Sequence, residues 1–303
     1  MQRIIFMGTP DYAEAILKQI LKTKDMKVVA VYTQPDKPVG RKKVMTPPVV
    51  KTLAEEEGIK VYQPTRLRDE TIVNELLTIK CDYIVVAAYG QILPRAILDH
   101  APCINLHASI LPQYRGASPI QQTLLNGDTN TGVTAMLMEE GLDTGDIIKI
   151  DTIDVTKDEM VETLFSRLTE TASNLTIDVL NNFNSFEIEK QDNSISTHCS
   201  KISKKDGEIS FDNAIKVYNK YRAFTPWPGI YLASGLKLKK ILLEDKDSSN
   251  KAGKILKIES DSIVVGCEIG SLRIFKVQPQ SKKEMDIISY INGKRLAVED
   301  TLS

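Results

Sequence analysis

The run Tyr83-Ile-Val-Val-Ala-Ala-Tyr89 is the most telling evidence for the fold class. It holds no charged side chain, as expected of a parallel strand that is covered by helices on both faces of its sheet. Residues 104–107 form a second short strand pattern, which we expect to pair beside it. Elsewhere in the first part of the chain, strand patterns alternate with amphipathic helix patterns. This alternation predicts an α/β fold with an open, Rossmann-like sheet.

The other predicted elements flank this run on both sides. Strands are expected at 3–7, 27–33, 59–62, 131–138 and 147–153, and helices at 11–21, 48–57, 68–79, 118–127 and 156–179. Asp11 and Ser118 are the expected N-caps of two of these helices. Thr156 and Glu159 have the spacing of a capping box, which predicts that the longest helix opens there.

The last third of the chain follows a different pattern. A polar stretch rich in Asn and Ser begins near residue 181, and beyond it short strands recur at even spacing with Gly, Asn and Asp between them. This pattern is typical of a small barrel. We therefore predict a first domain over 1–184, a linker over 185–206 and a small, OB-like β-barrel domain over 207–303. Trp227, between two prolines, is expected to anchor the core of that barrel, and a stacking platform for a base is the alternative.

Composition and charge narrow the class of protein. With 42% hydrophobic and 26% charged residues in 303, the chain is typical of a globular protein, and no apolar run is long enough for a membrane span. Four scattered cysteines without a CxxC pair exclude an obvious zinc site and fit a reducing compartment. No signal or transit peptide pattern is seen at the N-terminus, so we expect the cytoplasm of a bacterium.

The charge is distributed unevenly along the chain. Residues 1–200 carry a net charge of −7, whereas residues 201–303 carry +6, with 19 Lys and Arg against 13 Asp and Glu. A basic last third is what a nucleic-acid-binding surface requires. Solvated lysines explain the same numbers equally well, so charge alone does not decide between the two interpretations.

Residues 8–11, Gly-Thr-Pro-Asp, lie where a nucleotide-binding turn would lie, between the first strand and the first helix. The dinucleotide fingerprint needs three glycines at this place, and only Gly8 is present. A plain turn between strand and helix is the favoured interpretation. We therefore predict no nicotinamide cofactor.

The most informative segment for chemistry is residues 103–119, which read CINLHASILPQYRGASP. Asn105 and His107 lie two apart on the predicted strand, so both side chains project from one face near the end where open α/β sheets bind ligands. An amide and an imidazole are suited to stabilising an oxyanion, and His107 is the best-placed acid or base. Asp143, on a loop flanked by glycines, can orient His107. Taken singly, these residues fit an ordinary strand end and an ordinary turn better.

Two patterns taken together change this interpretation. N-x-H-x-S-x-L-P-x-x-R-G over 105–116, followed by G-x-D-x-G-D over 141–146, resembles the folate-dependent formyltransferase family. The resemblance implies transfer of a formyl group from 10-formyltetrahydrofolate to an amine, without a metal ion, with Asn105, His107 and Asp143 as the catalytic residues. Ala108 and Ile110 depart from the Gly and Leu usual in this pattern, and both changes are conservative in bulk.

The same resemblance implies the folate-binding residues. The pterin is expected to be buried between loops that follow the strands and to be bound mainly by backbone groups. The implied residues are Tyr89, Gly90, Ile92, Ser109, Ile110, Leu111, Pro112, Glu139, Glu140, Gly141 and Leu142.

Further segments at 6–11, 32–48, 87–94 and 222–229 resemble the branch of the family that formylates the methionine of initiator tRNA. The resemblance implies initiator methionyl-tRNA as acceptor and a basic loop that enters the acceptor-stem end, with Arg41 at the critical position. We also expect a monomer. The implied tRNA-binding residues are Lys37, Arg41, Lys42, Lys43, Lys201 and Lys204.

Two alternatives stay open. A formyltransferase that acts on a nucleotide sugar or another small amine would share the three catalytic residues, but it should lack the Arg41 loop and the 222–229 segment. A non-catalytic tRNA-binding protein with the same fold is the alternative from another class. The intact Asn105, His107 and Asp143 argue against it.

Overall fold

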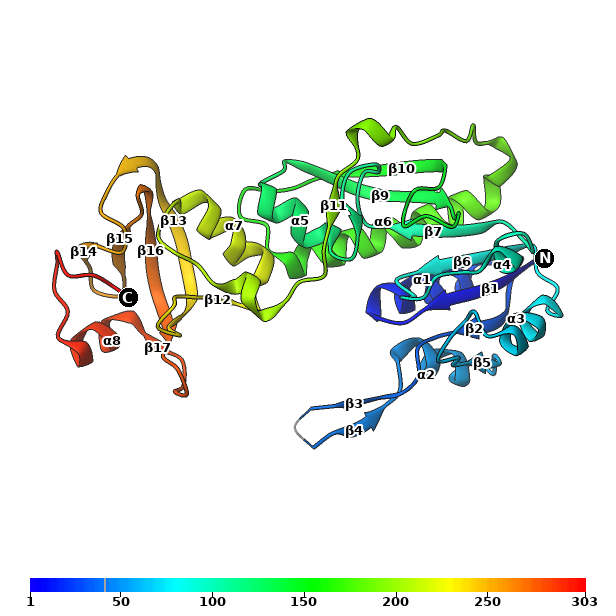
Figure 1. Cartoon of the computed structure of the whole chain (residues 1–303), viewed down its shortest axis with the longest axis horizontal. Helices are drawn as coiled ribbons and strands as arrows, with labels where there is room; N and C mark the ends of the chain where they lie inside the picture. Colours follow the sequence, from blue (N-terminus) through cyan, green and yellow to red (C-terminus); the bar gives the residue numbers. More distant parts are fainter. Residues whose placement is uncertain (41) are drawn as a thin grey trace. The chain divides into compact units, whose positions relative to one another are not determined.

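The computed structural model describes residues 1–40 and 42–303. The chain divides into two compact units (Figure 1). Unit 1 comprises residues 1–119, 130–154 and 165–199, and unit 2 comprises residues 120–129, 155–164 and 200–303. Of the predicted linker, residues 185–199 lie in unit 1 and residues 200–206 lie in unit 2.

Unit 1 is built around a seven-stranded mixed sheet with the order β10-β9-β7-β6-β1-β2-β5. The strands that run parallel are β1 (Gln2–Gly8), β2 (Met26–Tyr32), β5 (Val61–Tyr62), β6 (Tyr83–Ala87) and β7 (Cys103–His107). Two antiparallel strands, β9 (Asn130–Leu137) and β10 (Ile147–Asp154), extend the sheet beyond β7. The predicted open α/β sheet is confirmed. The chain runs from β1 to β2 on one side and returns to β6 on the other, so the strand order reverses between β1 and β6, where such sheets bind ligands.

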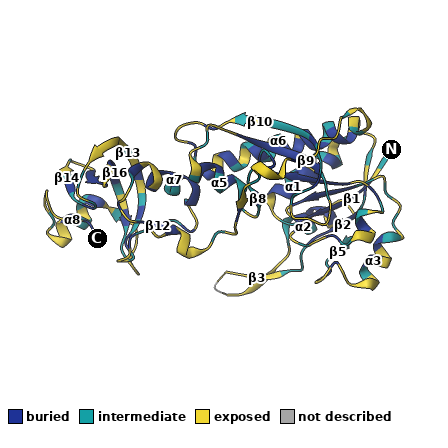
Figure 2. Cartoon of the chain, turned by 45° about the horizontal axis from the view of Figure 1, so that its top comes forward, coloured by how far each residue is buried: buried dark blue, intermediate teal, exposed yellow. Residues whose placement is uncertain are grey.

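Helices on the sheet create the core of unit 1. They are α1 (Asp11–Lys22), α2 (Val49–Glu56), α3 (Glu70–Leu77), α4 (Arg95–Leu98) and, from Phe165 onward, α6 (Val161–Asn182). α3 and α4 bury apolar side chains in one cluster with Ile5, Met7, Ile84 and Cys103 of the strands. α1 and α6 meet through the rings of Tyr12 and Phe165, edge to face at 6.2 Å. The dark blue strands in Figure 2 show that this sheet is the buried centre of unit 1.

Two helix starts differ from the sequence-based expectation. In α1, Pro10 takes the N-cap position with extended backbone and Asp11 is already helical, so Asp11 is not the cap. α6 begins at Val161, beyond the predicted capping box. The Glu159 carboxylate does accept hydrogen bonds from the N–H (3.3 Å) and hydroxyl (3.1 Å) of Thr156. These bonds close a separate turn ahead of the helix.

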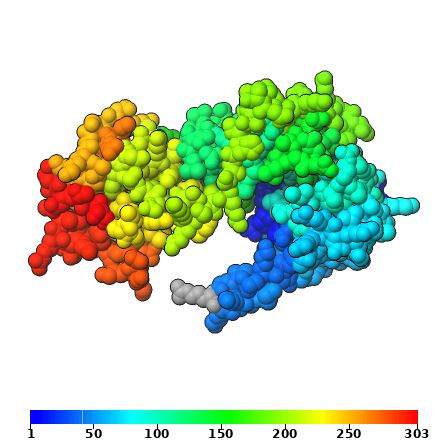
Figure 3. Space-filling model, in the orientation of Figure 1, coloured from blue at the N-terminus to red at the C-terminus, as the bar shows by residue number. Residues whose placement is uncertain are grey.

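Shorter elements complete unit 1. They are β3 (Lys37–Val39), β4 (Val44–Thr46), β8 (Arg115–Gly116), β11 (His198–Cys199) and the 3-10 turns η1 (Phe183–Ser185) and η2 (Asn193–Ile195). β3 and β4 form an antiparallel hairpin, and β8 and β11 pair in parallel. In Figures 1 and 3 the hairpin extends away from the sheet of unit 1.

Unit 2 contains an antiparallel sheet with the order β12-β13-β16-β15-β14, and β17 pairs with β16. The strands are β12 (Ile230–Tyr231), β13 (Lys237–Ser249), β14 (Ile255–Ile258), β15 (Ile263–Gly266), β16 (Ile269–Gln278) and β17 (Met285–Asp286). The helices are α5 (Pro119–Asn126), α7 (Ala214–Phe224) and α8 (Ile287–Lys294), with the 3-10 turn η3 (Lys204–Gly207). The predicted β-rich C-terminal domain is therefore confirmed.

The expectation that Trp227 anchors the core of this domain is wrong. Its side chain is 61% exposed, whereas Phe224 at the end of α7 is only 2% exposed and fills the core. The reason is the turn that follows α7. The N–H of Gly229 donates to the carbonyl of Phe224 at 2.8 Å, which places Trp227 on the outside of the turn.

Candidate active site

The end of β7 carries the two polar side chains that the sequence singled out. β7 lies between β6 and β9, with Asn105 opposite Val86 on one side and Met136 on the other. Asn105 is 9% exposed and His107 is 6% exposed. Their alternate positions on the strand project both side chains from the face that carries Cys103. Asn105 and His107 therefore lie at the carboxyl edge of the parallel strands, as expected from the sequence.

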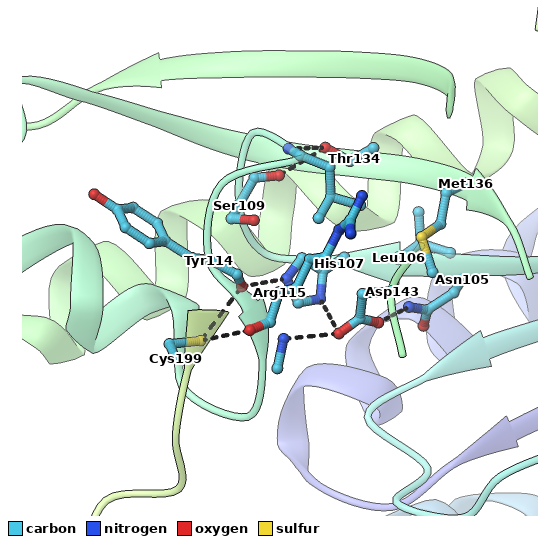
Figure 4. A network of polar contacts seen from close by, with 12 residues as sticks. Asn105, Leu106, His107, Ser109, Tyr114, Arg115, Thr134, Met136, Asp143 and Cys199 are labelled. Carbon is cyan, nitrogen blue, oxygen red and sulfur yellow. Dashed lines mark hydrogen bonds and ion pairs between the residues drawn. The ribbon is translucent and has the colours of Figure 1, made fainter. Parts of the chain in front are cut away.

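Asp143 joins them from the loop after β9. Its Oδ2 accepts a hydrogen bond from the N–H of Gly116 at 2.9 Å and lies 3.7 Å from His107 Nδ1. Its Oδ1 accepts a long bond, 3.4 Å, from Asn105 Nδ2. Figure 4 shows the three side chains converging. The structure thus brings together the residues predicted to be catalytic, although Asn105 and Asp143 lie 38 positions apart.

The hydrogen bonds of His107 decide which ring nitrogen carries a proton. Nε2 lies 2.9 Å from the carbonyl oxygen of Tyr114. A carbonyl oxygen only accepts hydrogen bonds, so Nε2 must be the donor. Nδ1 is therefore the ring nitrogen that is not used by the backbone, and it faces the Asp143 carboxylate at 3.7 Å. This arrangement places an imidazole nitrogen and a carboxylate beside an amide donor in a largely buried site.

The strand pair β8–β11 closes the site. Arg115 pairs with His198 and Gly116 with Cys199. A Cβ at Gly116 would lie 2.3 Å from the carbonyl oxygen of Cys199, and the backbone of Gly116 has φ +119°. Only glycine fits such a position. This gives the R-G pair of the sequence pattern a structural reason, because the N–H of Gly116 holds Asp143.

The four residues 109–112 are mostly buried, and the polar groups of Ser109 and Leu111 are hydrogen-bonded within unit 1. Ser109 is fully buried, and its hydroxyl donates to the carbonyl of Gln113 at 2.6 Å. Its own carbonyl accepts from the Thr134 hydroxyl at 2.7 Å, and the same hydroxyl accepts from the N–H of Leu111. Leu111 and Pro112 are buried, and Ile110 is partly exposed. Folate binding by these residues stays a prediction.

The other residues expected to bind folate lie on two loops. Tyr89 is 2% exposed, and in the described part of the chain its hydroxyl has no hydrogen-bond partner. Burial raises the pKa of this hydroxyl. Gly90, Ile92 and the four residues 139–142 are exposed or partly exposed. Ile92 and Leu142 are 74% and 67% exposed, which leaves apolar surface that an aromatic ligand could cover.

The basic segment after β2 was predicted as a loop, and it forms the β3–β4 hairpin. Lys37 pairs with Thr46 and Val39 with Val44, and Lys37, Lys42 and Lys43 are exposed. Arg41, predicted to be critical for tRNA, lies outside the described residues. Three-residue strands are too short for an alternating pattern to appear in the sequence.

Two side chains hold the root of this hairpin. Asp36 accepts hydrogen bonds from Lys51 Nζ at 3.0 Å and from Gln63 Nε2 at 2.7 Å. Both hydrogen bonds lower the pKa of the Asp36 carboxyl, and the bond from Gln63 contributes more than the bond from Lys51. Gln63 Nε2 also donates to the carbonyl of Gln34 at 2.9 Å. Among the contacts of the described residues, these side chains tie the hairpin to the sheet at its base.

Lys201 and Lys204 are exposed on unit 2. Lys204 begins η3 and lines a surface pocket of about 560 Å³ together with Lys205, Lys237 and Lys282. No carboxylate is found among the described lining residues. The pocket therefore concentrates positive charge.

Sequence reasoning missed Gln191. It lies in the polar stretch interpreted as the start of a linker, yet it is only 9% exposed and its amide contacts the Asp143 loop. A single Gln in a polar stretch gives no periodic signal. Arg115, which contacts Gln191, is part of the family pattern, but the sequence predicted no role for its side chain.

Within residues 1–40 and 42–303, no group of three or more His, Cys, Asp or Glu is placed to hold a metal ion. In the same described ranges, no helix is long and apolar enough to cross a membrane.

Comparison with known proteins covers nearly the whole chain. Residues 2–180 match the family model described as formyl transferase, and residues 201–295 match that of the formyl transferase C-terminal domain. A methionyl-tRNA formyltransferase of Sulfurimonas denitrificans is 67% identical over 301 residues, which cover 99% of this chain and 100% of the relative. The methionyl-tRNA formyltransferase of Campylobacter jejuni is 48% identical over 305 residues, and both chains are covered completely, at 100%.

Solved structures show the same fold. An N-formyltransferase from Helicobacter canadensis, in complex with folinic acid and dTDP-3-aminofucose, is similar with a TM-score of 0.71 at 20% identity, covering 92% of this chain and 100% of that one. HypX from Aquifex aeolicus, in complex with tetrahydrofolic acid, has a TM-score of 0.60 at 15% identity, covering 99% of this chain and 49% of that one. At such identities the likeness concerns the fold alone.

Proposed function

This chain belongs to the formyl transferase family and, within it, to the methionyl-tRNA formyltransferases, and we propose that it transfers the formyl group of 10-formyltetrahydrofolate to the α-amino group of methionine on initiator tRNA. The product is N-formylmethionyl-tRNA for translation initiation. The observation that carries this function is the convergence of Asn105, His107 and Asp143 at the carboxyl edge of the sheet.

The first role of the site is to stabilise negative charge on the formyl oxygen when the amine attacks the formyl carbon. Asn105 Nδ2 carries two N–H groups, and one of them faces Asp143 at a long 3.4 Å. The other N–H of this amide donates to the developing oxyanion. A donor of this kind, fixed in a largely buried site, is worth about 3–4 kcal/mol in the transition state.

The second role concerns His107 and the proton. Because Nε2 is already bonded to Tyr114, His107 acts through Nδ1. When protonated, Nδ1 donates toward the oxyanion, and Asp143 at 3.7 Å supplies the compensating charge. The attacking amine must lose a proton as the bond to the folate nitrogen breaks. Asp143, directly or through water, receives this proton for return to the leaving nitrogen.

The formyl donor is a substrate. Its proposed binding residues lie in the loops at 89–92 and 139–142 and in the segment 109–112. Ile92 and Leu142 present exposed apolar surface for the pterin, and the glycines at 90 and 141 leave backbone groups accessible. The buried Tyr89 hydroxyl, which lacks a partner in the described chain, is suited to a polar group of the ligand or a bridging water. The proposed set comprises Tyr89, Gly90, Ile92, Ser109, Ile110, Leu111, Pro112, Glu139, Glu140, Gly141 and Leu142.

Lysines with exposed side chains support the tRNA contacts. Lys42 and Lys43 lie at the tip of the hairpin, beside Arg41 in the sequence. Lys204 contributes to the basic pocket of unit 2, where positive charge can bind phosphates of the RNA backbone. The proposed tRNA-binding residues are Lys37, Arg41, Lys42, Lys43, Lys201 and Lys204.

We further propose a monomeric enzyme in the bacterial cytoplasm. Its proposed domains are a formyltransferase domain over 1–184 and a tRNA-binding domain over 207–303. Of the linker over 185–206, the part up to residue 199 is compact with unit 1. Size-exclusion chromatography with light scattering measures the oligomeric state, and a dimer at micromolar concentration contradicts this part of the proposal.

The function is tested by a formylation assay. Purified protein is incubated with formyl-labelled 10-formyltetrahydrofolate and charged initiator tRNA, and the label on the methionine is followed. A nucleotide sugar that carries an amino group, and an elongator methionyl-tRNA, serve as competing acceptors. Label on the initiator tRNA is the expected result. Transfer to the sugar amine with none to the tRNA would establish the alternative function instead.

A further inference from the structure

Gln191 is buried, and both its amide nitrogen and its amide oxygen are hydrogen-bonded. Its Nε2 donates to the carbonyl oxygens of Asp143 at 2.9 Å and Gly145 at 2.7 Å. Its Oε1 accepts from the guanidinium of Arg115, from Nε at 3.1 Å and from Nη2 at 2.7 Å. Gln191 therefore bridges the Asp143 loop to strand β8. It does so from a stretch 48 residues beyond Asp143 in the chain.

The Asp143 loop needs such support. Asp143 has φ +53°, in the left-handed region that L residues with side chains avoid. This conformation persists only where the surroundings impose it. The two hydrogen bonds from Gln191 hold the backbone on both sides of Thr144, and they fix the direction in which the Asp143 carboxylate leaves the loop.

Arg115 decides which end of the Gln191 amide faces the loop. A guanidinium only donates, so the amide oxygen must point to Arg115 and the amide nitrogen to the two carbonyls. The Nη2 of Arg115 is also held by the Asn193 side chain at 2.8 Å. Arg115 itself is 3% exposed, so its position is fixed by packing as well.

Three consecutive residues of the same segment contact three parts of the site. The Tyr114 carbonyl accepts from His107 (Figure 4). The Arg115 side chain donates to Gln191, and the Gly116 N–H donates to the Asp143 carboxylate. The contacts form a closed path from the Asp143 carboxylate through Gly116, Arg115 and Gln191 to the Asp143 backbone. Displacement of any one member moves the carboxylate relative to His107.

We propose that Gln191 is a positioning residue of the formyl-transfer reaction, which, oriented by Arg115, holds the Asp143 carboxylate at its distance from His107 and Asn105. The hydrogen bonds of Gln191 go to Arg115 and to backbone carbonyls, and none goes to the side chain of Asn105, His107 or Asp143. Gln191 acts through Asp143. The inference rests on the proposed function because its readout is formylation of methionyl-tRNA.

Gln191→Glu is the decisive variant. A glutamate keeps the size of the side chain and accepts from Arg115 more strongly, but an ionised carboxylate cannot donate to the carbonyls of Asp143 and Gly145. We expect kcat to fall roughly ten- to a hundredfold, as for a reacting group displaced by about 1 Å, with the KM for tRNA changed less than about threefold. The pH profile of kcat is expected to shift, because the carboxylate beside His107 Nδ1 has moved.

A double-mutant cycle separates positioning from a general structural role. If Gln191 acts through Asp143, Gln191→Glu costs little further activity once Asp143→Asn is present. A structural defect would lower kcat by the same factor in both backgrounds. If Gln191→Glu does not accumulate as folded protein, Arg115→Lys replaces it in the cycle, because lysine keeps the charge and lacks the paired donors that orient the amide.

Gln122→Glu is the matched control. It makes the same chemical change on α5, where the Gln122 amide donates to Asn126 at 2.9 Å, and full activity is expected. Near-unchanged kcat in Gln191→Glu, or equal factors in the two arms of the cycle, overturns the positioning role while the parent protein still formylates tRNA. A parent protein that does not formylate tRNA at all contradicts the proposed function instead.

Discussion

The active site and the β3–β4 hairpin belong to the same unit, and they are held in opposite ways. Asp143 is fixed by contacts to residues 27, 38 and 48 positions away in the chain, in a largely buried network. Among the described residues, the hairpin pairs Lys37–Val39 with Val44–Thr46, and the side chains of both strands are exposed (Figures 2 and 3). This contrast matches what each region is proposed to recognise. Developing charge on one oxygen requires donors at fixed positions, whereas phosphates spaced along RNA accept cations that adjust.

The largest effect is expected in the active site. Asn105→Ala and His107→Ala should each lower kcat by a factor on the order of a hundred to a thousand, because one donor to the oxyanion is worth about 3–4 kcal/mol. Folate affinity should change little. Single-turnover formylation and folate titration measure the two quantities. His100→Ala serves as the control, since its ring contacts the carbonyl of Ile79 away from this network. A variant with near-full kcat contradicts the assignment.

The same substitution at two glycines tests how tightly each region is packed. In Gly116→Ala the new Cβ would meet the Cys199 carbonyl at 2.3 Å, at φ +119°. We expect a decrease of about 3 kcal/mol or more in the free energy of unfolding, from strain and overpacking together. Gly40→Ala places its Cβ in open space at φ +71°, so only the backbone cost of about 1 kcal/mol applies. Urea unfolding curves measure both. Equal decreases would mean that the site is no more tightly packed than the hairpin.

Local signals made one part of the active site predictable. The apolar run at 83–89 and the N-x-H pair predicted β6 and β7 with Asn105 and His107 on one face, because the alternation of a strand is encoded by neighbours. Asp143 alone looked like a turn residue. It became a candidate only through the family pattern.

Other features depend on contacts that a local pattern does not contain. Gln191 lies in a polar stretch, and its role arises from a loop 48 residues away. Each hairpin strand has three residues, too few for a period to be visible. Trp227 is apolar and was expected inside, but a turn closed by Gly229 exposes it. In each case the deciding interaction joins backbone groups or residues far apart in sequence.

A smaller effect is expected at the hairpin tip. Lys42→Ala combined with Lys43→Ala should lower kcat/KM for tRNA about tenfold. The slope of log affinity against log salt should become shallower by about one to two, or about one for each phosphate that is no longer neutralised. Folate binding should stay unchanged, and Arg41→Leu should act in the same direction. Fluorescence titrations with tRNA at several salt concentrations measure the slope. Lys18→Ala, which removes a lysine paired with Glu14 on α1, is the control. An unchanged slope would show that the tip does not bind phosphates.

The smallest effect is expected at the root of the hairpin. Hydrogen bonds from Gln63 and Lys51 lower the pKa of Asp36 below the usual value of about 3.9. A group with a lowered pKa stabilises the folded form above its unfolded pKa, and this contribution disappears as the pH falls through the lowered value. In the parent protein, hydrogen exchange of residues 33–40 should be slower than in Asp36→Asn at neutral pH. The parent's rate should approach that of Asp36→Asn only as the pH falls below about 4.

The Asp36→Asn variant also makes the comparison between the two regions quantitative. Asparagine can still accept a hydrogen bond from Gln63, but it has no charge for Lys51, so the hairpin root should exchange faster than in the parent protein at about pH 6. This difference should shrink steadily as the pH falls below about 4. The active site should not respond, because in the described chain none of its hydrogen bonds involves Asp36. If exchange in the Asp143 loop changes together with the root, the two regions are coupled, and the hairpin is held by more than its base.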